Sequence, residues 1–446
     1  MAKKARKKAA ARKKSPSSTS ASLSSVLSLA KQRLHADMKP VMGQVKHVVG
    51  ALEYELKKQK LKARVIIGGS LAKNTYLPGD HDVDVFVAFD YSSKSSDIST
   101  KLGHVLGKIK HVSVTRVHGS RDYFQLTLTQ PAANLRFEII PVLAIHEPSA
   151  AVNITDCSPL HVAWVKKEIA KKKSLADEIK LTKSFCKAAG VYGAESYIKG
   201  FSGHVVDILT IYYGGFVPLL KAAQSWKAKD VIDFYNKHRG KALHALNASK
   251  LQSPLIVVDP IQKERNAAAA LDYAKWERFR IAAHQFLKKP AIAFFIKKDL
   301  TLEDIKQRAG THKLVMIDIT AQHGKEDVVG AKLLKSFEYL KKKLGDHEFE
   351  LYDTGWIWDK DTKALFFFIL NPAVLPPTRC MAGPALSFAQ HVAHFKSVHK
   401  KTFEKNNRMF ADVPRRFRTP ELFVATVLKE PYVAEKVVSA RIIGGN

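Results

Sequence analysis

The chain contains few cysteines and no long apolar run. Cys157, Cys186 and Cys380 are the three cysteines among its 446 residues, and they lie far apart in the sequence. None has a partner at metal-ligand spacing, so they predict reduced thiols in a cytoplasmic protein rather than a disulfide framework. No stretch approaches the roughly 18 consecutive apolar residues of a membrane-spanning helix. We therefore expect neither a membrane segment nor a membrane partner.

Acidic residues are also scarce relative to basic ones. The chain has 41 Asp and Glu against 73 Lys and Arg, which gives a formal net charge of +32. Such a surplus favours a polyanionic partner, nucleic acid before anionic membrane, because neutralised phosphates release counterions. Solubility, or adaptation to a salty or hot habitat, is the alternative explanation.

Basic charge is concentrated at the N-terminus. The first fourteen residues, MAKKARKKAAARKK, hold eight Lys or Arg, and a Ser-rich stretch follows. No apolar core of signal-peptide length comes after these charges, so secretion is not expected. Residues 1–25 are predicted to form a disordered basic arm for RNA, with a plain solvating extension as the alternative.

A glycine turn between two strands is predicted within RVIIGGSLAKNTYLPGDHDVDVFVAF, residues 64–89. The first strand breaks at Gly69, Ser70 follows, and the second strand carries Asp82 and Asp84 on one face, since alternate residues of a strand point the same way. Magnesium binds through one or two carboxylates plus substrate phosphates, and a glycine turn lets backbone N–H groups cradle a phosphate. A lone Gly-Gly-Ser is usually only a turn and an Asp-x-Asp a solvated strand edge, so the signal is their order and spacing.

That order resembles the nucleotidyltransferase superfamily of DNA polymerase beta. The superfamily expects a third carboxylate on a later strand, and Glu138 in LRFEIIPV is the candidate. The chemistry would use two Mg²⁺ ions, one lowering the pKa of an attacking hydroxyl and the other offsetting charge on the leaving pyrophosphate. Glu138 is then the best candidate to help remove the hydroxyl proton.

The surrounding elements can be predicted from apolar spacing. Ordered structure should begin near Val26, and a helix opening at Lys39-Pro40 carries one apolar stripe. A further helix is expected at 97–110, with strands at 112–118, 122–129 and 135–143. After residue 150 the pattern becomes mainly helical, with one helix starting in DCSPLHVAWV and a basic helix at 180–189. The polar segment from 192 to 203 interrupts two helical patterns, which suits a substrate-contacting loop or a purely structural one.

Phrases within this helical region narrow the resemblance. VYGAE at 191–195, KGFSG at 199–203, and VDP at 258–260 followed by ERN at 264–266 resemble the archaeal-type (class I) CCA-adding tRNA nucleotidyltransferases. The similarity runs in order from about Lys39 to the last fifty residues. It implies template-independent addition of C, C and A to the 3′ end of tRNA, from CTP and ATP, with release of pyrophosphate.

The resemblance also assigns roles to residues. Asp82, Asp84 and Glu138 would be the catalytic metal ligands. The incoming nucleotide would be contacted by Gly69, Ser70, Lys73, Ser158, His161, Lys183, Tyr192 and Arg265. Arg265 and Lys183 would add positive charge along the triphosphate, although Lys183 also fits as one lysine among many on a basic helix.

Four positions depart from the family pattern. The family usually has Arg at Lys73, Glu at Asp82, Asp at Glu138 and Tyr at His204. At Asp82 the carboxylate is one methylene shorter than in the family, and at Glu138 it is one methylene longer, so the reach of the side chain toward the metals changes on each side. None of the four differences removes a charge, so we expect an active enzyme. Alternatives are another template-independent RNA nucleotidyltransferase, of the poly(A) or uridylyl type, and a catalytically inactive RNA-binding relative.

The last third of the chain reads as an RNA-holding region. Strands are predicted at AIAFFI, LVMIDI, EFELYDTGWIW and TKALFFFIL, with helices on one face of an antiparallel sheet. Trp356 and Trp358 could stack on bases, although packing is the favoured interpretation. The prolines of NPAVLPPTRCMAGPAL predict irregular structure, and His391, His394 and His399 predict a solvated basic helix rather than a metal site.

RNA contacts are predicted at a glycine and several basic residues. They are Lys199, Gly383, Arg415, Arg416 and Arg418, which would position the acceptor stem and T arm of tRNA through its backbone. We also expect that the bound RNA end, together with Arg265, shapes the pocket that switches from C to A. A homodimer is possible.

The predicted fold class is α+β. A polymerase-beta-like nucleotidyltransferase head at 26–150 follows the arm at 1–25. A mainly helical central domain for nucleotide and tRNA binding is predicted at 151–290, and an α+β tRNA-binding body and tail at 291–446.

Overall fold

The computed structural model describes residues 22–129, 135–371 and 373–444, and the chain divides into two compact units, Met1–Lys297 and Lys298–Asn446. Residues 1–21 of the basic arm predicted at 1–25 lie outside the described residues. Helix α1, Leu23–Arg33, begins slightly before the predicted start near Val26, because the Ser22 hydroxyl accepts a hydrogen bond from the Ser25 N–H and caps the helix.

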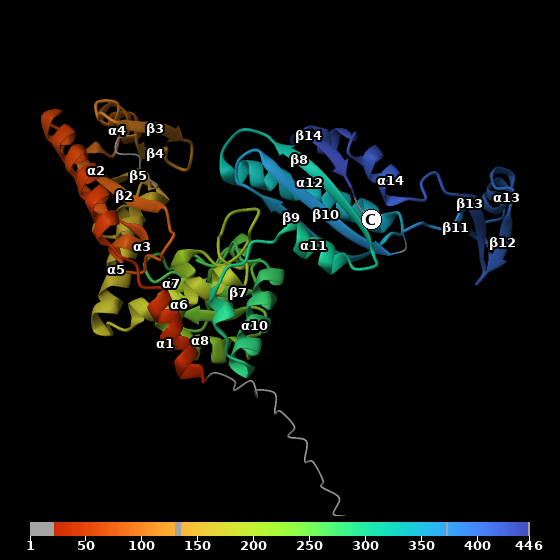
Figure 1. Ribbon diagram of the computed structural model, residues 1–446, viewed down its shortest axis with the longest axis horizontal. Coiled ribbons are helices and arrows are strands. Elements are labelled where there is room, and N and C mark those ends of the chain that lie inside the picture. The colour runs from red at the N-terminus through yellow and green to blue at the C-terminus, as the bar shows by residue number, and fades with distance from the viewer. Residues whose placement is uncertain (1–21, 130–134, 372, 445–446) are drawn as a thin grey trace, which may run out of the picture. The chain divides into compact units, whose positions relative to one another are not determined.

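The head of the first unit is a five-stranded sheet in the order β1-β2-β5-β4-β3 (Figure 1). The strands are β1 Ala63–Ile67, β2 Asp82–Phe89, β3 Val112–Val117, β4 Tyr123–Leu128 and β5 Arg136–Leu143. Strands β2 and β5 are parallel neighbours, and the other pairs are antiparallel. Helices α2 Lys39–Lys58 and α4 Ile98–Leu106 bury their apolar stripes against Val83, Val85 and Val87 of β2. The predicted helices and strands of the head are therefore confirmed, with small shifts at their ends.

The rest of the first unit is a helical core. Its larger helices are α5 Ser158–Lys171, α6 Leu175–Ala188, α7 Gly203–Tyr212, α8 Phe216–Ala223 and α10 Tyr273–Lys288. Phe185 of α6 lies at the centre and contacts the rings of Phe216, Phe279 and Phe286. Helix α1 packs into this core through Val26 and Ala30, although it precedes the head in sequence. A parallel strand pair, β6 Asp230–Asp233 and β7 Leu255–Val258, and the short helix α9 Ala242–Ala245 complete the unit.

The predicted strand AIAFFI is wrong, because it forms the 3₁₀ helix Ile292–Phe295. Phe295 is buried in the helical core, and its carbonyl accepts a hydrogen bond from the Ser184 hydroxyl at 2.8 Å. A short apolar run does not distinguish a strand from another buried segment.

The second unit is built on a four-stranded antiparallel sheet in the order β14-β8-β10-β9. Its strands are β8 Lys313–Ala321, β9 Glu350–Trp358, β10 Lys363–Asn371 and β14 Val437–Ile443. Helix α12, Glu326–Asp346, covers one face with the shorter α14 Pro420–Val427 and α15 Pro431–Ala434. Trp356 and Trp358 pack against this core, which confirms the packing interpretation.

The opposite face of this sheet is also covered, by α11 Leu302–Ala309. Ile305 and Ala309 of α11 pack on Phe367 and Ile369 of β10. The prediction of helices on one face only is therefore wrong. The continuous apolar run LFFFIL of β10 is explained by burial on both faces.

A small three-stranded sheet follows, in the order β11-β13-β12, with strands β11 Thr378–Ala385, β12 Thr402–Lys405 and β13 Arg408–Pro414. The prediction of irregular structure around Pro384 is wrong, because β11 is an edge strand and its register shifts between Ala382 and Ala385. Proline is tolerated at edges and bulges. Helix α13, Ala389–Val398, carries His391 and His394 as predicted, but His399, predicted on the same helix, follows its last residue in an extended conformation.

Within the described ranges, no single helix has the length and apolar character needed to cross a membrane. The bent pair Gly203–Tyr212 and Phe216–Ala223 meets that requirement only when its two helices are taken together.

Candidate active site

Three carboxylates converge at one end of the head sheet. Asp84 of β2 and Glu138 of β5 are direct partners in the parallel register, and Asp82 lies two residues before Asp84 on the same face. Asp82 is exposed, whereas Asp84 and Glu138 are partly buried. Parallel pairing therefore brings together three acids that are 56 residues apart at most in the sequence.

Burial and mutual repulsion disfavour ionisation of these acids. Burial raises the pKa of Asp84, against the opposing effect of the Lys73 charge. Burial, followed by the charges of Asp84 and Asp82, raises the pKa of Glu138 to about 7. A divalent cation would remove this repulsion, and an oxygen-only ligand set is the kind that Mg²⁺ prefers.

A pH-dependent stability should follow from Glu138. The unfolded chain releases this proton near 4.5 and the folded chain near 7, so without metal the wild type should lose stability as the pH rises between these values. The loss should reach up to about 3 kcal/mol. Glu138→Gln should reduce this loss in urea unfolding at pH 5 and pH 8 with chelator present, whereas the exposed Glu147→Gln should behave like the wild type. An unchanged pH profile in Glu138→Gln would contradict the crowded-acid geometry.

The predicted glycine turn lies directly beside the acids. Gly68 donates its N–H to the Asp84 carbonyl at 2.8 Å, and Gly69 opens the short helix α3, Gly69–Ala72. Gly69 has φ +54°, and a Cβ there would lie 1.7 Å from Asp84 Oδ2. Only glycine fits this approach. Ser70 follows in α3 and is partly exposed.

Lysines join the loop after α3 to the helical core. The Lys73 ammonium lies 2.5 Å from Oδ2 of the fully buried Asp207 on α7. Lys183 is also buried and donates to the carbonyl and hydroxyl of Thr75, and burial lowers its pKa to about 8. Lys187 pairs with Asp80. Lys73 and Lys183, predicted to contact the nucleotide, thus also hold the glycine turn against α6 and α7.

Breaking the most buried of these pairs should destabilise the protein. Lys73→Met would leave Asp207 as an uncompensated buried charge, at an expected cost of about 3–5 kcal/mol. Lys187→Met, in a more exposed pair, should cost less than about 1 kcal/mol. Lys73→Arg should be tolerated, because its fork can reach Asp207 Oδ1 as well, which lacks a partner within the described residues. Urea unfolding measures the stability of all three variants. Equal losses of stability in Lys73→Met and Lys187→Met would refute the assignment of Lys73–Asp207 as the pair that matters most for stability.

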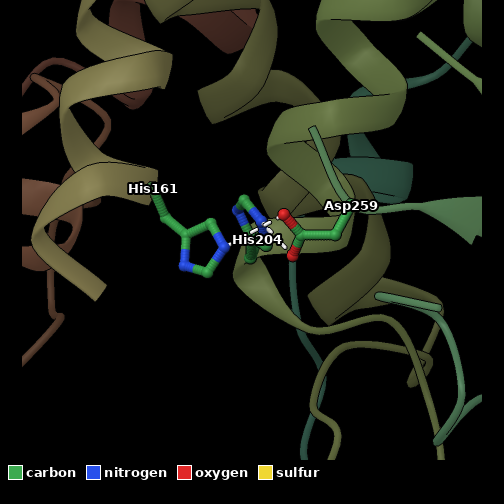
Figure 2. Close-up of side chains that lie close together, drawn as sticks. All are labelled: His161, His204 and Asp259. Atoms are coloured by element: carbon green, nitrogen blue, oxygen red, sulfur yellow. Dashed lines mark hydrogen bonds and ion pairs between the residues drawn. The ribbon is translucent and has the colours of Figure 1, made fainter. Parts of the chain in front are cut away.

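A second cluster of polar side chains lies around Asp259, just after β7. Its carboxylate lies 3.0 Å from His161 Nε2 and 3.4 Å from His204 Nε2 (Figure 2). An Arg265 guanidinium nitrogen lies 3.2 Å from the same carboxylate. The side chain is fully buried, and the hydrogen bond with His161 together with the adjacent His204 ring lowers its pKa against the opposing effect of burial. His161 and Arg265 were singled out from the sequence, but Asp259 was not. The VDP phrase that contains it was the available signal.

Ser158 and Tyr192 lie on the elements that border these clusters. Ser158 is the first residue of α5, one turn before His161. The Tyr192 ring lies under the Lys187 ammonium at 5.4 Å. The segment that follows Tyr192 folds back on itself, since the N–H of Phe201 donates to the Val191 carbonyl at 2.8 Å. Lys199, which was predicted to bind RNA, has a positive φ in this segment. Its carbonyl accepts a hydrogen bond from the N–H of Asp272, the residue that caps the start of α10.

The predicted RNA contacts in the second unit divide by exposure. The Arg415 side chain is 5% exposed and pairs with Glu348, so its prediction as an open phosphate contact is corrected to a structural role. A Cβ at Gly383 would lie 2.7 Å from the Phe395 ring, so this glycine permits packing of α13. Arg416 and Arg418 are exposed, with Arg416 over the Phe417 ring. These two remain candidates for phosphate contact.

The head sheet, its acids and its glycine turn are those of a nucleotidyltransferase, and a family model described as a nucleotidyltransferase domain matches residues 51–161. Models for the second domain of tRNA nucleotidyltransferases and for the C-terminal domain of CCA-adding enzymes match residues 177–296 and 310–442.

Curated relatives agree with these matches. A CCA-adding enzyme of Nanoarchaeum equitans is 32% identical over 79% of this chain and 84% of its own length. That of Methanocaldococcus jannaschii is 28% identical over 79% of this chain and 78% of its own length. The chain therefore belongs to the CCA-adding enzyme family. Among solved structures, a cytoplasmic RNA terminal U-transferase is 13% identical with a TM-score of 0.48, over 62% of this chain and 99% of that chain.

Proposed function

We propose that the protein adds C, C and A to the 3′ end of tRNA from CTP and ATP and releases pyrophosphate. The observation that carries this proposal is the parallel register of Asp84 and Glu138 beside Gly69, in a chain whose matches to the family cover the head, the helical region and the second unit. The family match favours CCA addition over the poly(A) or uridylyl alternative and over an inactive relative.

The residues at the sheet end fit a site for two Mg²⁺ ions. Asp82, Asp84 and Glu138 supply oxygen ligands only, and the parallel register places Asp84 directly opposite Glu138 with Asp82 on the same strand face. When bound, such ions would lower the pKa of the attacking 3′-hydroxyl and offset charge on the leaving pyrophosphate. Asp82, Asp84 and Glu138 would hold them.

The neighbouring side chains would bind the substrates. Gly69 leaves room for a phosphate close to Asp84, and Ser70 would donate a hydrogen bond to it. Arg265, with its exposed guanidinium edge, would contact the triphosphate or base. Glu138, on the strand beside Asp84, would help to remove the proton of the tRNA 3′-hydroxyl.

The basic surface would hold the RNA. A net charge of +32 favours backbone contacts with the acceptor stem and T arm, to which Lys199, Arg416 and Arg418 would contribute. We propose that the RNA end and Arg265 together shape the pocket that selects C and then A. The enzyme would act in the cytoplasm, and a homodimer stays a prediction.

Ordered addition to defined tRNA ends tests this function. Transcripts that end before the first C, after one C and after two C are incubated with Mg²⁺ and labelled CTP or ATP. The first two should accept only C and the third only A, and addition should then stop. Open-ended A or U tails, or nucleotide choice independent of the RNA end, would refute the proposal.

A further inference from the structure

The cluster around Asp259 is distinct from the acids of the head sheet. Its members come from three elements: His161 from the first turns of α5, His204 from the start of α7 and Asp259 from the end of β7 (Figure 2). One potential ligand atom of each residue lies within 4.8 Å of the other two. Among the described residues, no other group of three or more His, Cys, Asp and Glu side chains has its ligand atoms this close together, and the three acids of the head sheet lie farther apart than that.

We propose that His161, His204 and Asp259 bind one transition-metal ion, such as Zn²⁺ or Co²⁺, and that this ion excludes the nucleotide. Two imidazole nitrogens and one carboxylate oxygen form a borderline ligand set that favours Zn²⁺ and Co²⁺ over Mg²⁺. Tetrahedral bonds of about 2.0–2.1 Å place neighbouring ligand atoms roughly 3.3 Å apart. His161 Nε2 lies 3.0 Å from Asp259 Oδ1, and His204 Nε2 lies 3.4 Å from Asp259 Oδ2, so each nitrogen is close to that spacing from one carboxylate oxygen.

The surroundings of Asp259 hold the site in place. Its Oδ1 accepts hydrogen bonds from the N–H groups of Ile261 and Gln262, at 2.8 and 3.1 Å. These bonds fix the carboxylate, as outer-shell partners do in metal sites. The His161 and His204 rings are 4.4 Å apart, so one nitrogen of each can face the same ion beside Asp259.

Arg265 is the group that a metal ion would displace. Its guanidinium pairs with Asp259 Oδ2 at 3.2 Å and is about one-third exposed, so it can turn away into solvent. The proposed function assigns Arg265 to the incoming nucleotide, and the family resemblance assigns His161 to it as well. An ion at the cluster would take one of them as a ligand and repel the other, so metal and nucleotide should compete. This second consequence rests on the proposed function, whereas the metal site itself does not.

Cobalt titration of the full chain tests the metal site. The protein is stripped with chelator and titrated with Co²⁺, whose visible absorption reports nitrogen ligands. One ion should bind to the wild type, and His204→Tyr should weaken its affinity by at least about tenfold. The matched control is the double variant His391→Ala/His394→Ala, which removes exposed histidines of α13 and should bind Co²⁺ like the wild type.

A measurement on the wild type alone guards against a variant that misfolds. X-ray absorption of the Zn²⁺-loaded protein should show two imidazole ligands per ion together with oxygen ligands. An oxygen-only shell, or a Co²⁺ spectrum that persists unchanged in a folded His204→Tyr variant, would overturn the metal site.

Competition is measured by CTP binding in excess Mg²⁺. One equivalent of Zn²⁺ should weaken CTP binding to the wild type by about tenfold, the loss expected for a displaced nucleotide contact. His204→Tyr under the same conditions controls for Zn²⁺ that is chelated by CTP itself. CTP affinity that does not respond to bound Zn²⁺ would refute the competition. CCA addition without Zn²⁺ tests the proposed function separately, so either can fail while the other stands.

Discussion

Asp84→Asn should lower the rate of nucleotide addition at least about a thousandfold, which corresponds to about 4 kcal/mol of lost transition-state stabilisation. The substitution keeps the size of the side chain and removes only its charge. Asp84 is the central acid, since it pairs with Glu138 in the strand register and shares a strand face with Asp82. Single-turnover addition of CTP to a tRNA that lacks its end measures the effect.

The matched control for Asp84→Asn lies at the far end of the same strand. Asp90 follows β2 immediately, is exposed and accepts a hydrogen bond from the Ser92 N–H, which asparagine can also accept. Asp90→Asn should leave the rate within about twofold, because surface substitutions away from special features have small effects. The tRNA affinity of Asp84→Asn should match the wild type. Full activity in Asp84→Asn would identify an acid cluster without a catalytic role.

Gly69→Ala should lower the rate by about a hundredfold, because it would push Asp84 out of position. The new Cβ would lie 1.7 Å from Asp84 Oδ2, and a β-carbon never approaches that closely. Either the acid or the glycine turn must move, and both belong to the proposed site. Glycine adopts the positive φ at position 69 without strain, but alanine at this φ would add about 1–2 kcal/mol of backbone strain to the folded variant.

Gly79→Ala separates strain from collision. Gly79 also has a positive φ, of +81°, but a Cβ there meets no atom within 4 Å in the described parts of the chain. Both variants should therefore lose stability through backbone strain, and Gly69→Ala should lose more because of the collision, while only Gly69→Ala should lose most of its rate. Equal rates in the two variants would show that the approach of Gly69 to Asp84 has no part in catalysis.

The head of the fold could be predicted because its signals are local. The alternation in HDVDVFVAF placed Asp82 and Asp84 on one face, and the cap residues and apolar stripes gave the helices. The parallel pairing of β2 with β5 is not local, since β3 and β4 intervene in sequence. Glu138 was therefore reached through resemblance, and the register later placed it opposite Asp84.

The Asp259 cluster and the errors in the second half have a shared physical reason. His161, His204 and Asp259 come from segments that only tertiary packing brings together, and no spacing in the sequence relates them. AIAFFI is apolar because the helical core buries it, and LFFFIL because helices cover both faces of its sheet. The apolar composition of these segments predicts that they are buried, but it does not predict which helix or sheet packs against them.

Anomalous scattering from crystals soaked with Mn²⁺ and CTP tests the central claim most directly. Mn²⁺ takes the oxygen ligands of Mg²⁺ and can be located by its own signal. We predict a peak within bonding distance of Asp82 and Asp84, next to the CTP phosphates and beside Gly69, and no such peak in Asp84→Asn. A nucleotide bound elsewhere, or Mn²⁺ absent from these carboxylates while CTP is present, would contradict the account.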